Sequence, residues 1–124
     1  KRGSRAVKSQ APGVVLFVEK GFLDKDFAPL IVEQLDEALG DGVPPEIFVD
    51  GYDLEGYDPN VRVGATNWFK RNRDRVRAQH MLVRSKLTKM GLSVVSLALG
   101  GVIVGYDSRV SFESELARAL RNAR

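Results

Sequence analysis

Hydrophobic and polar positions along the chain form two alternating kinds of pattern. Short runs rich in β-branched and apolar residues predict strands of a sheet. These runs lie at residues 14–18, 47–49, 78–84 and 102–104. Between and after them, apolar residues recur every three or four positions, which predicts helices. The predicted helices cover residues 27–39, 59–72, 86–99 and a last segment that carries Phe112, Leu116, Ala119 and Leu120. Residues 1–10 are polar and form either an N-terminal segment or an edge strand.

Capping and helix-breaking residues place the ends of these helices. The candidate N-caps are Asp24 or Asp26, Asp58 before Pro59, Ser85, and Asp107 or Ser108. Glycine stops follow the first and third helices, at Gly40–Gly42 and Gly100–Gly101. The resulting order of elements is β-β-α-β-α-β-α-β-α. Such alternation predicts an α/β fold with a mostly parallel sheet of four to five strands, four helices and an antiparallel edge strand.

The composition is that of an ordinary globular protein, with 44% hydrophobic and 28% charged residues among 124. We therefore expect a single domain over residues 1–124. The absence of cysteine excludes disulfides, thiolate catalysis and cysteine zinc sites, and is typical of a reducing compartment. The basic start, Lys1–Arg5, is not followed by an apolar segment, so we expect no signal peptide and a cytoplasmic location.

Charge is strongly segregated along the chain, although the net charge is only +3. Residues 11–61 contain twelve acidic residues and two lysines, whereas residues 62–89 contain nine basic residues and one acidic residue. Such runs are typical of solvated faces, but a dipolar surface could also steer a charged partner or pair head to tail with a second copy. Trp68 and Phe69 beside the basic run have core spacing, and the acidic half repels phosphates. We therefore expect no nucleic acid partner.

Side chains that could support catalysis or metal binding are few. His80 is the only histidine and lies within a predicted strand, where we expect a hydrogen-bonded structural role. A metal site would therefore need carboxylates alone, and the candidate cluster is Asp50, Asp53, Glu55 and Asp58. Its spacing is not that of a calcium loop, so we interpret it as an acidic surface loop. The sequence also lacks a glycine-rich phosphate loop and a nucleophile elbow, so we predict no catalytic residue, no metal and no cofactor.

The seventeen residues from Met90 to Tyr106 carry no charge. This segment is too short and too interrupted by glycine to span a bilayer. The helix at residues 86–99 is apolar on two sides, although a helix on a sheet needs only one. The two sides carry Leu87, Gly91, Val94 and Ala98, and Leu92, Val95 and Leu99. Three covers for the second side stay open: the last helix, a homodimer or partner protein, and an apolar ligand or membrane.

Four stretches support a resemblance to a known family over nearly the whole chain. They are Asp50–Asp58, Trp68–Arg73, Val83–Leu87 and Leu97–Gly101. With the predicted order of elements, the chain resembles the STAS fold of anti-sigma-factor antagonists. More closely, it resembles the bacterial STAS-like proteins that are grouped with the CRAL-TRIO lipid carriers. The resemblance implies a regulatory interaction module.

The resemblance also implies a place for regulation. Antagonists of this kind are switched by phosphorylation of a Ser or Thr at the start of the helix after the third strand. A dianion there gains from the helix dipole and changes a docking surface. Residues 57–60 of this chain hold Tyr, Asp, Pro and Asn, and Thr66 lies about two turns into the helix. We therefore predict binding without a phosphoswitch, with Asp58 supplying a fixed negative charge.

Together these patterns predict a non-catalytic, STAS-like binding module with a protein partner, most simply a second copy of itself in a homodimer. The candidate binding residues are Tyr52, Asp53, Tyr57, Asp58, Leu92, Val95 and Leu99. The superfamily resemblance implies an alternative, a carrier of a small apolar or lipid-like ligand in a cavity lined by Leu87, Val94 and Leu97. An enzyme acting through Asp53 and Asp58 is a third hypothesis. We do not expect a membrane surface as partner.

Overall fold

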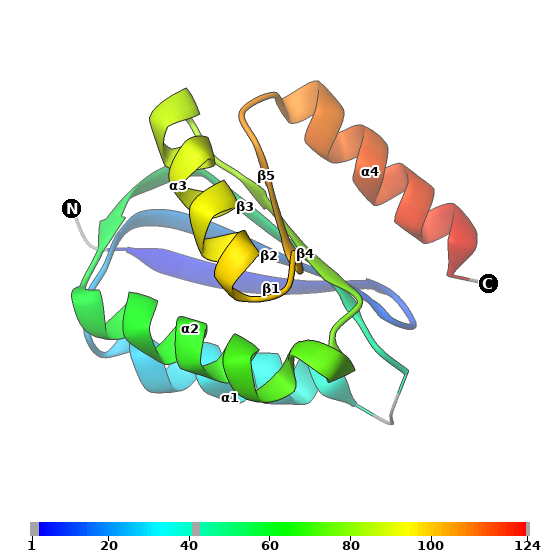
Figure 1. Cartoon of the computed structure of the whole chain (residues 1–124), viewed down its shortest axis with the longest axis horizontal. Helices are drawn as coiled ribbons and strands as arrows, with labels where there is room; N and C mark the ends of the chain where they lie inside the picture. Colours follow the sequence, from blue (N-terminus) through cyan, green and yellow to red (C-terminus); the bar gives the residue numbers. More distant parts are fainter. Residues whose placement is uncertain (1–2, 41–42, 124) are drawn as a thin grey trace.

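In the computed structural model, residues 3–40 and 43–123 form one sheet with helices on both faces (Figure 1). The strands are β1 (Ser4–Ala11), β2 (Val14–Leu23), β3 (Glu46–Tyr57), β4 (Ala78–Leu82) and β5 (Ile103–Tyr106). The α-helices are α1 (Phe27–Leu39), α2 (Pro59–Asn72), α3 (Lys86–Ala98) and α4 (Arg109–Asn122). A short 3₁₀ helix, η1 (Arg73–Arg75), follows α2. The predicted order of strands and helices is confirmed.

The five strands lie in the sheet in the order β1-β2-β3-β4-β5. Strand β1 pairs antiparallel with β2, whereas β2, β3, β4 and β5 pair parallel with their neighbours. A helix connects each parallel pair, because parallel strands need a long crossover between them. The predicted α/β fold with an antiparallel edge strand is therefore confirmed.

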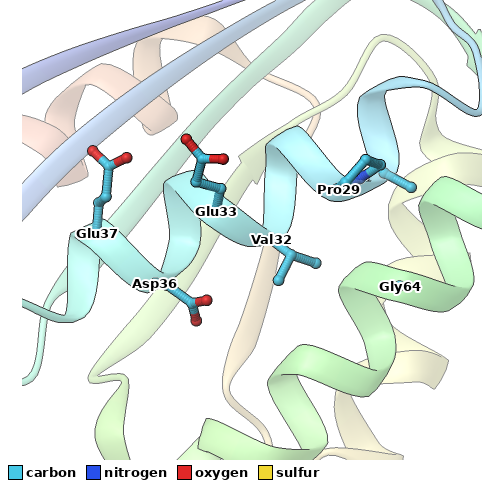
Figure 2. Close-up of a pocket in the computed structure, with 7 residues that line it drawn as sticks. Pro29, Val32, Glu33, Asp36, Glu37 and Gly64 are labelled. Atoms are coloured by element: carbon cyan, nitrogen blue, oxygen red, sulfur yellow. The ribbon is translucent and has the colours of Figure 1, made fainter.

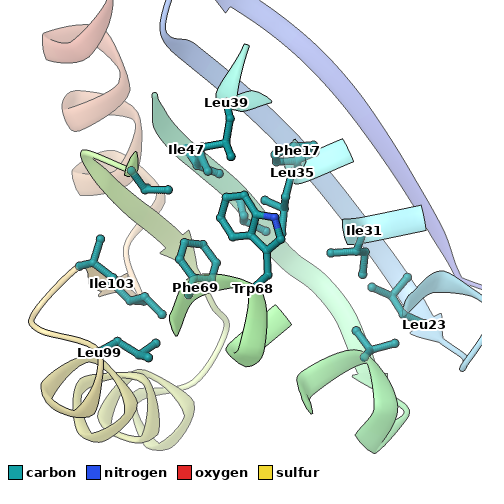
Figure 3. Close-up of a cluster of buried hydrophobic side chains, with 14 residues drawn as sticks. Phe17, Leu23, Ile31, Leu35, Leu39, Ile47, Trp68, Phe69, Leu99 and Ile103 are labelled. Atoms are coloured by element: carbon teal, nitrogen blue, oxygen red, sulfur yellow. The ribbon is translucent and has the colours of Figure 1, made fainter. Parts of the chain in front are cut away.

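Helices α1, α2 and α3 cover one face of the sheet, and α4 covers the other (Figure 1). Neighbouring side chains of a strand point to opposite faces, so Ile47 and Val49 enter the first core while Phe48 enters the second. Trp68 lies at the centre of the first core (Figure 3). Its indole Nε1–H donates a hydrogen bond to Asp36 of α1 at 2.8 Å, so the buried ring also satisfies its polar atom.

The second core lies beneath α4 and is smaller. Its buried residues are Val14, Phe48, Leu82, Phe112 and Ala119. Phe112 of α4 meets Phe48 of β3 edge to face, with ring centroids 5.7 Å apart. Because α4 packs on the face opposite α3, it does not cover α3. The alternative in which the last helix buries the second side of α3 is therefore wrong.

Strand β3 extends far beyond the predicted residues 47–49. Residues 50–57, which we interpreted as an acidic surface loop, form the second half of the strand. They pair with an extension of β2, where Lys20 lies opposite Asp53 and Leu23 opposite Tyr57. The interpretation was wrong because the acidic side chains here lie on the exposed side of the pleat, where charge does not interrupt the hydrogen-bonded ladder.

Side-chain caps begin three of the four α-helices, as predicted. The capping residues of α2, α3 and α4 are Asp58, Ser85 and Ser108. The N-cap of α1 is Asp26, whose side chain makes no capping bond. After α3, Gly100 and Gly101 both have φ of 80°, a conformation that favours glycine. Arg2 of the predicted edge strand and Asp41 and Gly42 of the predicted stop lie outside the described residues.

Candidate functional site

The inner side of helix α3 faces the sheet and carries Leu92, Val95 and Leu99. Leu92 packs against the first core, and Leu99 belongs to it with only 1% of its surface exposed. The backbone N–H of Ile103 donates to Ser96 Oγ at 3.1 Å, which ties this side of the helix to β5. Leu99 is therefore a buried core residue and is not exposed on the outer surface of the helix.

The outer side of α3 carries four large apolar side chains, each at least 64% exposed. They are Leu87, Met90, Val94 and Leu97, and we call them the α3 stripe. Their spacing of three, four and three residues places them on one narrow line along the helix. No other α-helix in the described part of the chain has more than one large apolar side chain as exposed as these.

A cavity of about 150 Å³ lies between the inner side of α3, the helices α1 and α2, and the sheet. Its lining is mainly apolar and includes Ile31, Leu35, Val61, Phe69, Met81 and Ile103. Four predicted binding residues also line it: Tyr57, Leu92, Val95 and Leu99. The predicted lining by Leu87, Val94 and Leu97 is wrong, because these side chains point away from the sheet into solvent.

A buried ion pair forms part of the cavity wall. Arg5 of β1 and Glu19 of β2 lie opposite each other in the sheet, and Arg5 Nη1 donates to Glu19 Oε2. Arg5 Nε also donates to Gln34 of α1 at 2.7 Å, and the guanidinium lies 4.2 Å from the centre of the Phe17 ring. Burial lowers the pKa of Arg5, and burial raises the pKa of Glu19 although the Arg5 charge opposes that rise.

Sequence reasoning missed this pair, because Arg5 lies in a polar edge strand and Glu19 beyond the predicted end of the second strand. The available signal was the period of two, which continues from Phe17 to Glu19 on the same side of β2. Pairing between strands, and not the sequence of either one, brings the two charges together.

Two further predicted binding residues lie elsewhere and already have partners. Arg84 Nη2 donates to Asp53 Oδ1 at 3.0 Å, and its guanidinium lies 4.8 Å from the centre of the Tyr52 ring. The Arg109 guanidinium approaches the same ring at 5.6 Å and donates to Asp50 at 3.0 and 3.3 Å. The seven predicted residues therefore divide between this arginine-bound corner, the cavity and the N-cap of α2.

A shallow groove runs between α1 and α2 on the outside of the molecule (Figure 2). Val32 and Asp36 lie on the side of α1 that faces α2, and Gly64 forms the opposite wall. Glu33 and Glu37 point away from α2 (Figure 2). The groove is open and lined by apolar and acidic residues, and it is separate from the cavity beneath α3.

A chain of hydrogen bonds surrounds His80 beneath α4. His80 Nε2 donates to Glu46 Oε2 at 2.7 Å, and Nδ1 is hydrogen-bonded to the Tyr106 hydroxyl at 2.7 Å. Arg118 of α4 donates to the same Glu46 oxygen. Burial raises the pKa of Tyr106 to about 12, which opposes its use as a nucleophile. The His80 imidazole is buried and makes two hydrogen bonds, as the sequence analysis expected of it.

Metal sites and membrane spans were sought over residues 3–40 and 43–123. No group of three His, Asp or Glu side chains is arranged there to hold a metal ion. No helix in these ranges is both long and apolar enough to cross a membrane. Of the acidic cluster predicted from sequence, Asp50 and Asp53 bind arginines and Asp58 caps α2.

No family model matches the chain, and no curated protein matches it. Solved structures, in contrast, do match this chain. An uncharacterized DUF3478-family protein from Shewanella loihica, with a SpoIIAA-like fold, aligns with a TM-score of 0.74 at 15% identity, covering 94% of this chain and 96% of that one. The anti-sigma factor antagonist SpoIIAA in its unphosphorylated form aligns at 0.71 and 12% identity, covering 93% and 98%. The chain has the SpoIIAA-like fold.

An anti-sigma factor antagonist from Mycobacterium paratuberculosis also aligns with this SpoIIAA-like chain, at a TM-score of 0.64 and 14% identity, over 94% of this chain and 95% of that one. At these identities the comparison shows the fold alone. The resemblance to the anti-sigma-factor-antagonist fold is thus confirmed.

Helix α2 follows the third strand of the sheet, β3. Asp58 is the N-cap there, and its carboxylate accepts the backbone N–H of Asn60 at 2.8 Å. Pro59 occupies the first turn. Thr66 is half-buried inside the helix and lines the cavity.

Proposed function

We propose that this chain is a non-catalytic regulatory binding module that self-associates through the α3 stripe. The observation that carries the proposal is the exposure of four large apolar side chains in one line on a helix whose other side is already packed. Apolar surface of this kind on a folded protein marks an interaction site. The solved anti-sigma factor antagonists of the same fold are consistent with such a role.

The spacing of the α3 stripe suits another helix as partner. Intervals of three, four and three residues are those of the a and d positions in paired helices, whose side chains pack into the partner's spaces. Gly91 lies beside the stripe, and a Cβ built on it would meet no atom within 4 Å. A second helix could therefore approach closely at this point.

The charge of α3 favours a second copy in antiparallel orientation. Lys86 and Lys89 lie at its N-terminal end, with Lys89 Nζ 3.7 Å from Asp107 Oδ1, and the helix itself contains no acidic residue. A parallel pair would bring these lysines together. An antiparallel pair would place them near the partner's C-terminal turn, where the helix dipole is negative. A two-fold axis between the helices would give both copies the same contacts.

Light scattering on the purified chain tests this proposal. The wild-type chain should have the mass of a dimer at micromolar concentration, and Val94→Asp should have the mass of a monomer. Val110→Asp is the matched control, because Val110 is 80% exposed on α4 and Val94 is 69% exposed on α3. A monomeric wild-type chain, or a dimer that survives Val94→Asp, would contradict the proposal.

The proposed interaction is constitutive. Residues 57–60 contain no Ser or Thr, and Asp58 supplies a fixed negative charge at the start of α2. Incubation with kinases from bacterial extracts should therefore leave residues 57–60 unmodified, as read by mass spectrometry of the peptide that contains them. Phosphate on that peptide would refute this part of the proposal.

A second candidate function, carriage of a small apolar ligand, is favoured by the cavity beneath α3. Its volume of about 150 Å³ equals that of an engineered protein cavity known to bind benzene, and is below the 300–1,000 Å³ of drug-sized sites. A compound of about six carbon atoms fits this space better than a lipid chain. Native mass spectrometry should detect a small molecule bound to the wild-type chain that is lost when Ala65→Leu fills the cavity. A wild-type chain that binds no small apolar molecule would exclude this function.

A further inference from the structure

The inner wall of the cavity selects among ligands, because Arg5 and Glu19 neutralise each other there, and the third charged lining residue, Arg62, is exposed to solvent. An entering carboxylate would lose its hydration and meet Glu19, and an ammonium group would meet Arg5 in the same way. A hydroxyl can accept an N–H from Arg5 and donate its own proton to Glu19. Among the described residues, the hydrogen bonds of Arg5 use Nε and Nη1, which leaves further N–H donors on the guanidinium.

The Arg5–Glu19 pair is fixed before any ligand enters. Gln34 of α1 accepts from Arg5 Nε, and the Phe17 ring stacks beneath the guanidinium. A ligand would therefore not have to order these side chains, which lowers the entropic cost of binding.

A second polar group on the wall, from another strand, points to the same ligand chemistry. The Gln79 side chain of β4 is 7% exposed and lines the cavity, and no hydrogen bond joins its amide to another described residue. No fully buried side-chain nitrogen or oxygen of the described residues lacks a partner. The Gln79 amide must therefore be open to the cavity, where it offers a neutral NH₂ group as donor and a carbonyl oxygen as acceptor.

We infer that the cavity is a binding site for a small neutral molecule with an apolar body of about six carbons and one hydroxyl group, recognised by Arg5, Glu19 and Gln79. The inference rests on the second candidate function and adds the polar group of the ligand. The apolar lining holds the body, and the mutually neutralised Arg5–Glu19 pair disfavours a charged head group.

Three probes with the same six-carbon chain test the inference: hexan-1-ol, hexanoate and hexylammonium. In titration calorimetry at pH 7, hexan-1-ol should bind at least about tenfold more tightly than either ion, because each ion leaves a buried charge uncompensated. Equal binding of all three would overturn the head-group selectivity and leave an apolar carrier function intact. Binding of none would overturn both, and preference for hexanoate would overturn the inference alone.

Two variants locate the site. Ala65→Leu should abolish binding of hexan-1-ol, whereas Ala38→Leu should not, because Ala38 is half-buried on α1 but does not line the cavity. Glu19→Gln leaves Arg5 as an unpaired cation and should shift the preference towards hexanoate. If Glu19→Gln does not fold, the three probes on the wild-type chain still decide the question. Unchanged binding of hexan-1-ol to a folded Ala65→Leu variant would place the site elsewhere.

Discussion

Leu97 and Leu99 lie two residues apart at the C-terminal end of α3, yet Leu97 is 82% exposed and Leu99 is 1% exposed. Two residues correspond to about 200° of rotation on a helix, so the two side chains point in nearly opposite directions. Leu99 reaches the first core and the cavity, while Leu97 ends the α3 stripe. The change from a packed side to an exposed side of α3 is therefore complete within one turn.

The same truncation at these two leucines should have different effects. Leu99→Ala removes buried methyl groups and should lower the free energy of unfolding by about 2–5 kcal/mol. Leu97→Ala should change it by less than about 0.5 kcal/mol when measured in urea at a dilution where the chain is monomeric. Similar losses for both variants would contradict the exposed position of Leu97.

The hydroxyl of Tyr106 should matter for the stability of the fold. Tyr106→Phe removes the partner of His80 Nδ1 and leaves a buried polar atom unsatisfied, so the free energy of unfolding should fall by about 1–3 kcal/mol. Tyr57→Phe is the control, because the Tyr57 side chain is 44% exposed, and its effect should stay within about 0.5 kcal/mol. Urea unfolding of both variants measures the difference.

Acid should weaken the fold through Glu46. Burial by itself would raise the pKa of Glu46, but hydrogen bonds from His80 and Arg118 outweigh it and lower the pKa below the ordinary value. The unfolded chain then binds the proton more readily, so this stability is present above about pH 4.3 and is lost as the pH falls through the lower folded value. Glu46→Gln should flatten the acid side of a plot of unfolding free energy against pH.

Glu19 is a control for that experiment, because its pKa is shifted in the opposite direction from that of Glu46. Burial raises its pKa in the folded chain, so its contribution is present below the unfolded value and is lost as the pH rises through the higher folded value. Glu19→Gln should therefore not reproduce the flattening on the acid side. A wild-type chain whose stability does not change in the window assigned to Glu46 would refute the assignment.

Two glycine-to-alanine substitutions should change stability in opposite directions. Gly64 lies in the middle of α2, and an added Cβ would meet no atom within 4 Å, so Gly64→Ala should stabilise by about 0.5–1 kcal/mol. Gly100 has φ of 80°, so Gly100→Ala should destabilise by about 1–3 kcal/mol through the backbone alone. Thermal unfolding of both variants would show shifts of opposite sign, and shifts of the same sign would contradict this prediction.

Much of the fold could be predicted from local signals. The apolar runs that begin with Val14 and Ile47 predicted two strands. The capping residues Asp58, Ser85 and Ser108 predicted where three helices begin. Apolar runs and caps can be recognised from neighbouring residues alone. The length of β3 could not be predicted in this way. Residues 50–57 extend as a strand because β2 offers a partner edge, and a carboxylate on the open side of the pleat does not interfere.

The candidate site was predicted less well, and the reason is physical. The sequence alone determined that residues 86–99 form a helix with two apolar sides and that no cysteine and a single histidine are present. Only the tertiary structure decided which side is open, because that depends on α4 packing on the opposite face of the sheet. Likewise, only the pairing of β1 with β2 brought Arg5 to Glu19 beside the cavity. Contacts between segments distant in sequence carry no local pattern, so the structure alone could place them.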